Sequence, residues 1–220
     1  METVARKVLA MNKHLIPILA MIAIPLKMNS GWQNLKFSHI PQNQLNFSSE
    51  GMQIKINKSS SPVILPLSKS SIVKAFKVDL EFNGQMQSAD GKWPEDAYLR
   101  VGFVVPGQRR LGVMERLVAA DWVKQLFRLA PDGAGVDKIY FYNLVSDAKY
   151  LNQRRILPGS KDLLEERIVA EKPPSSQTMT FAYSFAKPLK VLALWLSSDG
   201  DDTGSQFDLL IKNLSLDVDE

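Results

Sequence analysis

The fold is decided by the end of the chain, which reads Val191-Leu-Ala-Leu-Trp-Leu-Ser-Ser-Asp199 and, after Gly204, Phe207-Asp-Leu-Leu-Ile-Lys-Asn-Leu-Ser-Leu-Asp217. The first run is apolar at nearly every position, as expected of a strand that is buried on both faces. The second run alternates apolar and polar residues, which is typical of a strand with one face in water. The residues between the runs, rich in Asp and Gly, favour a turn. The sequence therefore predicts a closing hairpin that completes a sheet built by earlier strands.

Short strand-like runs separated by turn residues fill most of the remaining chain. Alternation is clearest at 74–82, where four apolar residues would face one way: Phe76, Val78, Leu80 and Phe82. Further runs lie at 31–37, 51–57, 63–67, 97–105, 138–145, 166–170 and 178–185. One helix is predicted near 114–129, because Val118, Trp122 and Leu126 form an apolar stripe at helical spacing. Since no strand–helix–strand unit repeats, we predict a mainly β protein, an antiparallel two-sheet sandwich of the jelly-roll type with one inserted helix.

The composition limits the chemistry that the chain can carry. Its 220 residues suit one sandwich domain, which we place at 31–220. The absence of cysteine excludes disulfides, thiol catalysis and thiolate metal sites. With only His14 and His39, neither a histidine-rich metal site nor a Ser-His-Asp triad is well supported. The net charge is +4, but the basic residues are scattered among 23 acids, so we expect no binding to nucleic acid.

The N-terminus resembles an export signal. An uncharged apolar run at 15–26 follows Arg6, Lys7 and Lys13. It is shorter than the roughly 20 residues that a membrane-spanning helix needs, but it has the layout of a secretory signal peptide. We therefore predict that residues 1–30 are a signal peptide, or an anchor to the inner membrane formed by residues 8–26. The protein would then be periplasmic or secreted; a cytosolic protein with an apolar first strand is the remaining alternative.

The acidic turn is a candidate metal site. Asp199, Asp201 and Asp202 place several carboxylate oxygens within one turn, and Ca²⁺ prefers oxygen ligands of this kind. The alternative is an ordinary turn in which the aspartates accept hydrogen bonds from their own backbone. No EF-hand-like spacing is present, so the only cofactor that the sequence suggests is Ca²⁺ at these three residues.

Aromatic side chains are candidate ligand-binding residues. Trp93 lies in a polar loop beside Pro94 and is expected to be exposed, while Tyr140 and Tyr142 share one face of a strand. Exposed aromatic rings provide stacking surfaces for sugars, but core packing is the alternative, and we expect it for Trp195. The predicted helix, with the basic residues that precede it, would either cover an open sheet face or dock on a partner.

Catalysis has little support in the sequence. Pairs such as Glu165-Glu166 and Asp201-Asp202 are neighbours along the chain, which does not indicate the separation that glycoside hydrolysis requires between two carboxyl groups. A glycine-rich loop that could cradle a phosphate is also absent. We therefore expect a non-catalytic protein.

Three segments resemble a known family. They are Gly31-Trp-Gln-Asn-Leu-Lys-Phe37, Asp96-Ala-Tyr-Leu-Arg-Val-Gly-Phe-Val-Val105 and Leu194-Trp-Leu-Ser-Ser-Asp-Gly-Asp-Asp-Thr-Gly204. In this order they resemble the bacterial domain-of-unknown-function family 3047. The resemblance covers about 31–216, but 111–135 looks like an insertion, and a tryptophan–glutamate pairing expected before the last strands is missing. It implies an exported jelly roll akin to galactose-binding-like and carbohydrate-binding modules, with no established activity.

These observations lead to one functional prediction and two alternatives. We predict an exported, non-catalytic β-sandwich that binds a ligand, such as a glycan or another component of the cell envelope. The first alternative is a periplasmic accessory subunit, tethered by its N-terminal segment to a membrane protein complex on which the helix docks. The second alternative is a divergent enzyme that acts on glycans.

Overall fold

The computed structural model describes residues 21–87, 91–113, 115, 119, 121–129 and 135–219. Strands dominate this part of the chain, and a single short helix, α2, is fully described. The elements are β1 (Met21–Ala23), β2 (Gln33–Asn34), β3 (Gln44–Ser48), β4 (Gly51–Asn57), β5 (Ser60–Gln85), β6 (Leu99–Gly107), α2 (Asp121–Arg128), β7 (Gly135–Val145), the 3-10 turn η1 (Ala148–Tyr150), β8 (Arg154–Ile156), β9 (Leu164–Glu171), β10 (Thr178–Asp199) and β11 (Gln206–Asp219).

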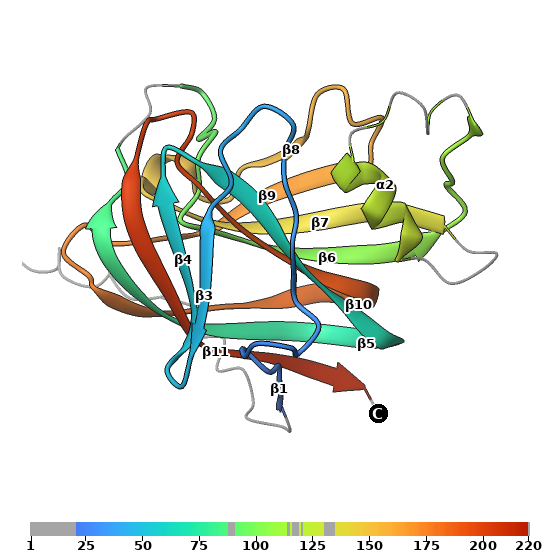
Figure 1. The fold of residues 1–220 in the computed structure, drawn as a ribbon, viewed down its shortest axis with the longest axis horizontal. Helices are drawn as coiled ribbons and strands as arrows, with labels where there is room; N and C mark the ends of the chain where they lie inside the picture. The colour runs from blue at the N-terminus through green and yellow to red at the C-terminus, as the bar shows by residue number, and fades with distance from the viewer. Residues whose placement is uncertain are drawn as a thin grey trace, which may run out of the picture.

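The strands form one continuous sheet that is folded into two layers (Figure 1). Their order is β3-β4-β11-β5-β10-β6-β7-β9-β8, with β1 beside β11 and β2 beside β5. All neighbouring pairs are antiparallel except β7 and β9, which run parallel. The prediction of a mainly β, antiparallel sandwich with one helix is confirmed, with the refinement that shared strands join its two layers into one sheet.

The layers are joined because β5 and β10 are long strands that belong to both of them. The first part of β5 pairs with the last part of β10, from Ser60 with Asp199 to Pro66 with Ala193. Pairing resumes from Ser71 with Val191 to Val73 with Leu189, and again from Ala75 with Ser184 to Glu81 with Thr178. Shifts of register lie between these regions, and such irregularities let a strand bend. Two pairs of predicted strands therefore merge. The strands predicted at 63–67 and 74–82 are parts of β5, and those predicted at 178–185 and 191–196 are parts of β10.

The predicted closing hairpin is wrong in its pairing. β10 and β11 are consecutive in the sequence, but β5 lies between them in the sheet. The connection after Asp199 crosses from one layer to the other, because Asp199 lies opposite the start of β5 and Gln206 lies opposite its end. A hydrogen bond of 3.1 Å from Gly200 N to Ser59 O holds this crossing.

The main core lies between the two layers. Its centre is Phe76 of β5, which is fully buried and contacts Phe181 edge-on with ring centroids 5.1 Å apart. Phe103 and Tyr142, from the opposite layer, lie 5.6 and 5.9 Å from the same ring. Burial of large aromatic side chains is the main source of stability in such a core.

A second cluster covers the outer face of β10, β6 and β7. Leu126 of α2 is fully buried there, and Trp122 and Phe127 pack against the same cluster. Figure 1 shows α2 on this layer, beside the segment that joins β2 to β3. The helix therefore covers an open sheet face, which is one of the two roles that the sequence suggests for it. Its described part is Asp121–Arg128, shorter than the predicted 114–129, and residues 114, 116–118 and 120 lie outside the described residues.

Part of the predicted leader packs onto the sandwich. β1 pairs with β11 through Met21 and Asp217, and the Trp32 indole donates a hydrogen bond of 2.8 Å to the Pro25 carbonyl. Residues 1–20, which hold most of the predicted signal peptide or anchor, lie outside the described residues. Within the described part, no helix is long and apolar enough to cross a membrane. The leader and the domain boundary after residue 30 remain predictions.

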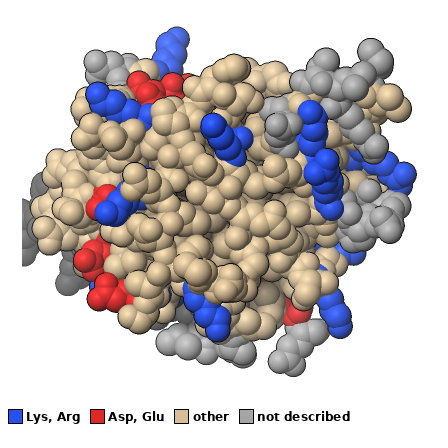
Figure 2. Space-filling model, viewed as in Figure 1, with Lys and Arg blue, Asp and Glu red and all other residues tan. Residues whose placement is uncertain are grey.

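The face of the molecule shown in Figure 2 carries charged side chains of both signs around its rim and few in its middle.

Candidate functional site

A cleft of about 220 Å³ lies on the outer face of the layer that contains β10, β6, β7 and β9. Its floor follows from the strand register. Trp195 lies opposite Gly102, Gly102 opposite Phe141, and Phe141 opposite Glu166, so one row crosses all four strands. Residues in such a row project from the same face of the sheet. The second cluster covers part of this face, and the cleft occupies what remains.

Four aromatic rings form a continuous series along the cleft. Phe37 meets Trp122 at 5.9 Å, Trp122 meets Trp195 at 5.6 Å, and Trp195 meets Phe141 at 5.4 Å, each in an edge-to-face arrangement. Phe141 and Trp195 are buried, whereas Phe37 and Trp122 are partly exposed. The series therefore runs from the sheet floor to an accessible aromatic surface.

Gly102 allows the side chains of Phe141 and Trp195 to lie close to the β6 backbone on the floor of the cleft. A Cβ atom at this position would lie 2.7 Å from the Phe141 ring and 2.9 Å from Cβ of Trp195. Both distances are too short for a side chain to be present without a shift of its neighbours. Glycine inside a strand often marks such a close approach.

A chain of alternating charges closes one end of the cleft. Buried Arg100 on β6 donates to Asp199 at the end of β10, to Glu166 on β9 and to the carbonyl of Glu95. Arg155 on β8 donates 2.6 Å to the other oxygen of Glu166 and reaches both oxygens of Glu95 at 2.7 and 3.0 Å. Two guanidinium groups thus hold three carboxylates in fixed positions.

The charge of Arg100 is stabilised by its partners. Burial disfavours the charged guanidinium, but Asp199 and Glu166 outweigh this effect and raise the pKa of Arg100. Asp199 also accepts a hydrogen bond of 2.5 Å from Ser60 Oγ. Ion pairs that are buried this deeply fix the positions of their side chains more reliably than they increase the net stability of the fold.

Three carboxylates form a second acidic group at the rim. Oxygens of Asp96, Asp201 and Asp202 lie within 4.8 Å of one another and could hold a metal ion. Burial, and then the charge of Asp199, raise the pKa of Asp201 to about 6, while burial and Asp96 raise the pKa of Asp202. Oδ2 of Asp96 already accepts hydrogen bonds of 2.8 Å from Thr203 N and 2.5 Å from Thr203 Oγ1. This oxygen therefore holds the turn in place and is less available to a metal ion.

The predicted metal ligands are therefore only partly brought together. Asp201 and Asp202 share a site, but Asp199 is committed to Arg100 and Ser60. The third carboxylate beside them belongs to Asp96, which lies far away in the sequence. Ca²⁺ at this group remains a prediction.

The predicted aromatic residues do not form one site. Trp93 is half-buried, and the Arg155 guanidinium stacks on its ring at 4.5 Å. Tyr142 is only 4% exposed and packs in the main core, where burial raises its pKa, so its ring offers no face to a ligand in solution. Tyr140 is partly buried against the same core, on the opposite side of β7 from Phe141. None of the three lines the cleft.

Most of the residues that line the cleft were not predicted as site residues from the sequence. Arg100 and Gly102 are both unusual inside an apolar strand, and these were signals that something occupies that face. Glu166 and Arg155 carried no comparable signal, because only the parallel pairing of β9 with β7 brings them to the cleft.

The charge of the cleft limits its ligands. Its lining includes five carboxylates (Glu95, Glu166, Asp199, Asp201 and Asp202) and two guanidinium groups (Arg100 and Arg155), a formal excess of three negative charges. The Trp195 indole N–H is buried and has no hydrogen-bond partner among the described residues. The arrangement suits a neutral or cationic ligand that has both polar edges and a flat apolar face.

The first prediction concerns Arg100. Arg100→Met should lower the free energy of unfolding by about 3–5 kcal/mol, because it leaves Asp199 and Glu166 buried without their counter-charge. For a chain of this size the midpoint of thermal unfolding should fall by roughly 10 °C. Lys74→Met, which removes an exposed pair with Asp219, is the control and should leave the melt unchanged. A melt of Arg100→Met equal to wild type would contradict the assigned network.

The second prediction concerns the pH dependence of Asp201. Because its pKa is raised in the folded state, the folded protein binds more protons than the unfolded chain between about pH 4 and 6, and stability falls as the pH rises through that range. Asp201→Asn should remove this loss and stabilise the protein at pH 7.5 by about 1 kcal/mol after allowance for solvent screening, or roughly 2–4 °C, with no gain at pH 4.

Thermal melts in a chelator at both pH values measure this effect, and Asp208→Asn on β11 is the matched control. An equal effect of Asp201→Asn at both pH values would contradict the raised pKa. Repeating the melts with calcium tests the metal prediction, because a bound cation would stabilise the wild type and not Asp201→Asn.

Comparisons with known proteins give matches among solved structures alone. No protein-family model matches the chain, and no curated protein matches it. Among solved structures, the chain is similar to the xylan-binding module CBM15, with a TM-score of 0.38 and 10% identity over 91% of this chain and 97% of that chain. It is also similar to Xylanase10C from Cellvibrio japonicus in complex with xylopentaose, with a TM-score of 0.32 and 9% identity over 90% of this chain and 29% of that chain. An exo-beta-agarase gives a TM-score of 0.32 and 7% identity over 91% and 25% of the two chains.

Proposed function

We propose that the protein is a non-catalytic binding module whose cleft takes a neutral or amino-sugar unit of a glycan. The observation that carries the proposal is the meeting, in one cleft, of the partly exposed rings of Phe37 and Trp122 with fixed carboxylates. A sugar ring presents an apolar face to aromatic side chains and hydroxyl groups to polar ones. The cleft provides both, because Phe37 and Trp122 supply the aromatic surface and the fixed carboxylates supply the polar groups.

The size and charge of the cleft define the ligand further. Its volume of about 220 Å³ is below the roughly 300–1,000 Å³ of sites for drug-sized ligands, which favours one ring or the end of a chain. Its excess of negative charge disfavours acidic sugars. The unpartnered indole N–H of Trp195 is a donor that a hydroxyl oxygen or a bridging water would satisfy.

The state of the carboxylates supports binding rather than catalysis. The oxygens of Glu166 and Asp199 are each engaged by guanidinium groups, which fixes the positions of both side chains. Asp201 has a raised pKa, and no ion pair is seen for it in the described part of the chain. Asp202 also has a raised pKa, but it follows Asp201 in the same turn, and carboxylate oxygens of the two lie within 4.8 Å of each other. Glycoside hydrolysis instead uses two carboxyl groups that flank the scissile bond, about 5–10 Å apart.

The proposal includes export. The basic and apolar sequence before residue 27 is the support for a signal peptide or an anchor, and a periplasmic or secreted module would meet glycans of the cell envelope. The resemblance to family 3047 is consistent with this location. Tethering to a membrane protein complex remains the alternative, with the outer side of α2 as its docking element.

Binding to an array of neutral, amino-sugar and acidic oligosaccharides tests the function. Wild type should bind a neutral or amino-sugar member, and Trp122→Ala and Phe37→Ala should each weaken that binding at least tenfold by removing the stacking surface. Trp93→Ala is the matched aromatic control, because Trp93 lies outside the cleft lining, and it should bind like wild type.

Two results would contradict the proposal. One is the absence of binding across the array, and the other is loss of binding in Trp93→Ala with binding kept in Trp122→Ala. Chromatography of the bound oligosaccharide after long incubation tests the non-catalytic part, since shortened products would identify an enzyme.

A further inference from the structure

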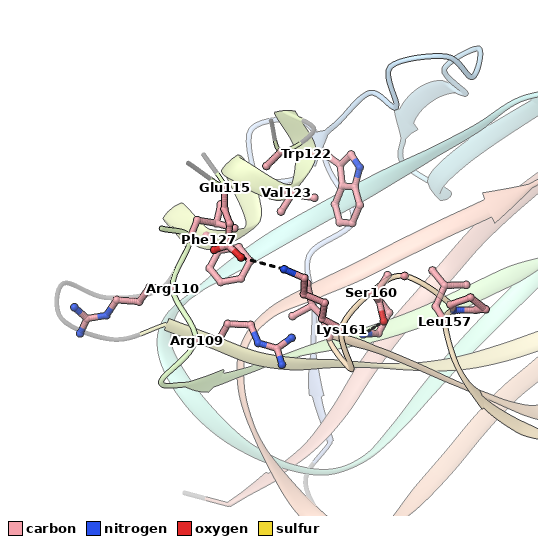
Figure 3. A pocket seen from close by; sticks show the side chains of 15 residues that line it. Arg109, Arg110, Glu115, Trp122, Val123, Phe127, Leu157, Ser160 and Lys161 are labelled. Atoms are coloured by element: carbon pink, nitrogen blue, oxygen red, sulfur yellow. Dashed lines mark hydrogen bonds and ion pairs between the residues drawn. The ribbon is translucent and has the colours of Figure 1, made fainter. Parts of the chain in front are cut away.

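A second and larger cavity lies on the other side of Trp122. Its volume is about 610 Å³, within the range of sites that enclose a small molecule. Figure 3 shows side chains of α2 on one side of it and the loop that carries Ser160 and Lys161 on the other. Trp122, Leu157 and Leu164 line this cavity as well as the cleft, so the two spaces share a wall.

The lining of this cavity is mostly apolar. Val123, Phe127, Leu157, Leu163 and Leu164 supply aliphatic and aromatic surface, which suits a hydrocarbon body. The loop opposite α2 is held in place by backbone hydrogen bonds, from Leu163 N to Ser160 O at 3.0 Å and from Leu157 N to Leu164 O at 2.9 Å. The cavity therefore has a structured wall on that side.

One polar atom of the cavity lining has no hydrogen-bond partner in the described part of the chain. This atom is Nη1 of Arg109, which is buried and finds no hydrogen-bond partner among the described residues, although Arg109 lines the cavity. Glu115 is the only carboxylate among the described lining residues; one of its oxygens accepts a hydrogen bond of 2.9 Å from Gly112 N, and the other pairs with Lys161 at 3.3 Å. Burial of a donor on a charged group without a partner is costly, so a ligand that supplies an acceptor would be favoured.

The position of Arg109 is fixed by its backbone. Its carbonyl accepts a hydrogen bond of 3.0 Å from Val136 N at the start of β7. A Cβ at Gly135 would lie 1.8 Å from that carbonyl oxygen, so only glycine permits this approach. In Figure 3 the Arg109 side chain points toward the loop of Ser160 and Lys161, whereas Arg110 points away from the other lining residues.

The structure assigns this cavity to an amphipathic carboxylate, a ligand with an unbranched hydrocarbon tail and a single anionic head that pairs with Arg109. The tail lies among the apolar residues between α2 and the loop, and the head accepts from the unpartnered guanidinium nitrogen. A carboxylate satisfies guanidinium geometry through paired hydrogen bonds, which a neutral amide or alcohol cannot reproduce with the same strength.

Isothermal titration calorimetry with octanoate, decanoate and decanamide tests this assignment on the full chain. Decanoate should bind roughly 15-fold more tightly than octanoate, because each buried methylene contributes about fourfold. Decanamide, which keeps the tail and lacks the charge, should bind at least tenfold more weakly than decanoate. No binding of decanoate up to its solubility limit, or equal affinity for decanoate and decanamide, would overturn the assignment.

Variants identify the two parts of the site. Arg109→Met should weaken decanoate binding at least tenfold and leave decanamide binding unchanged, which also shows that the variant is folded. Arg154→Met removes an arginine outside this cavity, one that pairs with Glu165, and should bind decanoate like wild type. Val123→Trp should fill the cavity and abolish binding of both ligands, with an unchanged thermal melt as evidence of folding. Unchanged decanoate binding in Arg109→Met would overturn the proposed contact.

The outcome is separable from that of the glycan proposal. Phe37 lines the cleft and not the larger cavity, so Phe37→Ala should lose glycan binding and keep decanoate binding. Arg109→Met should lose decanoate binding and keep glycan binding. Loss of both activities in either variant would contradict the assignment of two separate sites.

Discussion

The interaction on which the site depends is the contact of buried Arg100 with Asp199 and Glu166. A guanidinium group on a sheet face would be unfavourable without compensation, and here two carboxylates from strands on either side provide it. The contact joins the end of β10, the start of β6 and the parallel strand β9. It thereby fixes the closed end of the cleft, and it holds Asp199 at the point where the chain crosses between layers.

The same region explains how the fold and the site are related. Because β5 and β10 belong to both layers, the inner face of the sheet is filled by the aromatic core around Phe76, while the outer face remains free for other uses. α2 and the segment around Phe37 cover part of this outer face and leave two spaces on either side of Trp122. One space is rich in carboxylates and aromatic rings. The other is mostly apolar and holds the buried Nη1 of Arg109, which has no hydrogen-bond partner among the described residues. Neighbouring spaces of such different chemistry suit different ligands.

The sequence predicted the class of fold well, because alternation at 74–82 and the apolar run 191–196 are local signals of buried strands. It did not predict that these segments belong to long bent strands, since Pro66 and Pro188 look like strand ends when read alone. It also assumed that β10 and β11 form a hairpin, whereas β5 separates them. Long-range pairing of this kind leaves no trace in a single sequence.

The site was harder to predict for a similar reason. Trp93 was expected to be exposed because its neighbours are polar, yet Arg155 from a distant strand stacks on it. Tyr142 was a binding candidate, but the register turns it into the core and turns Phe141 toward the cleft. The acidic turn contributes Asp201 and Asp202 as expected, while the third carboxylate comes from Asp96. Residue types could be recognised from the sequence, but the face on which each one lies could not.

The indole N–H resonances of the four tryptophans provide the most direct measurement of the central claim, that the outer-face cleft is the ligand site. When ¹⁵N-labelled protein is titrated with an oligosaccharide that it binds on the array, the signals of Trp122 and Trp195 should shift, since both rings line the cleft. Those of Trp32 and Trp93, which lie outside it, should remain in place. Shifts confined to Trp32 or Trp93 would contradict the account and move the site to another face of the sandwich.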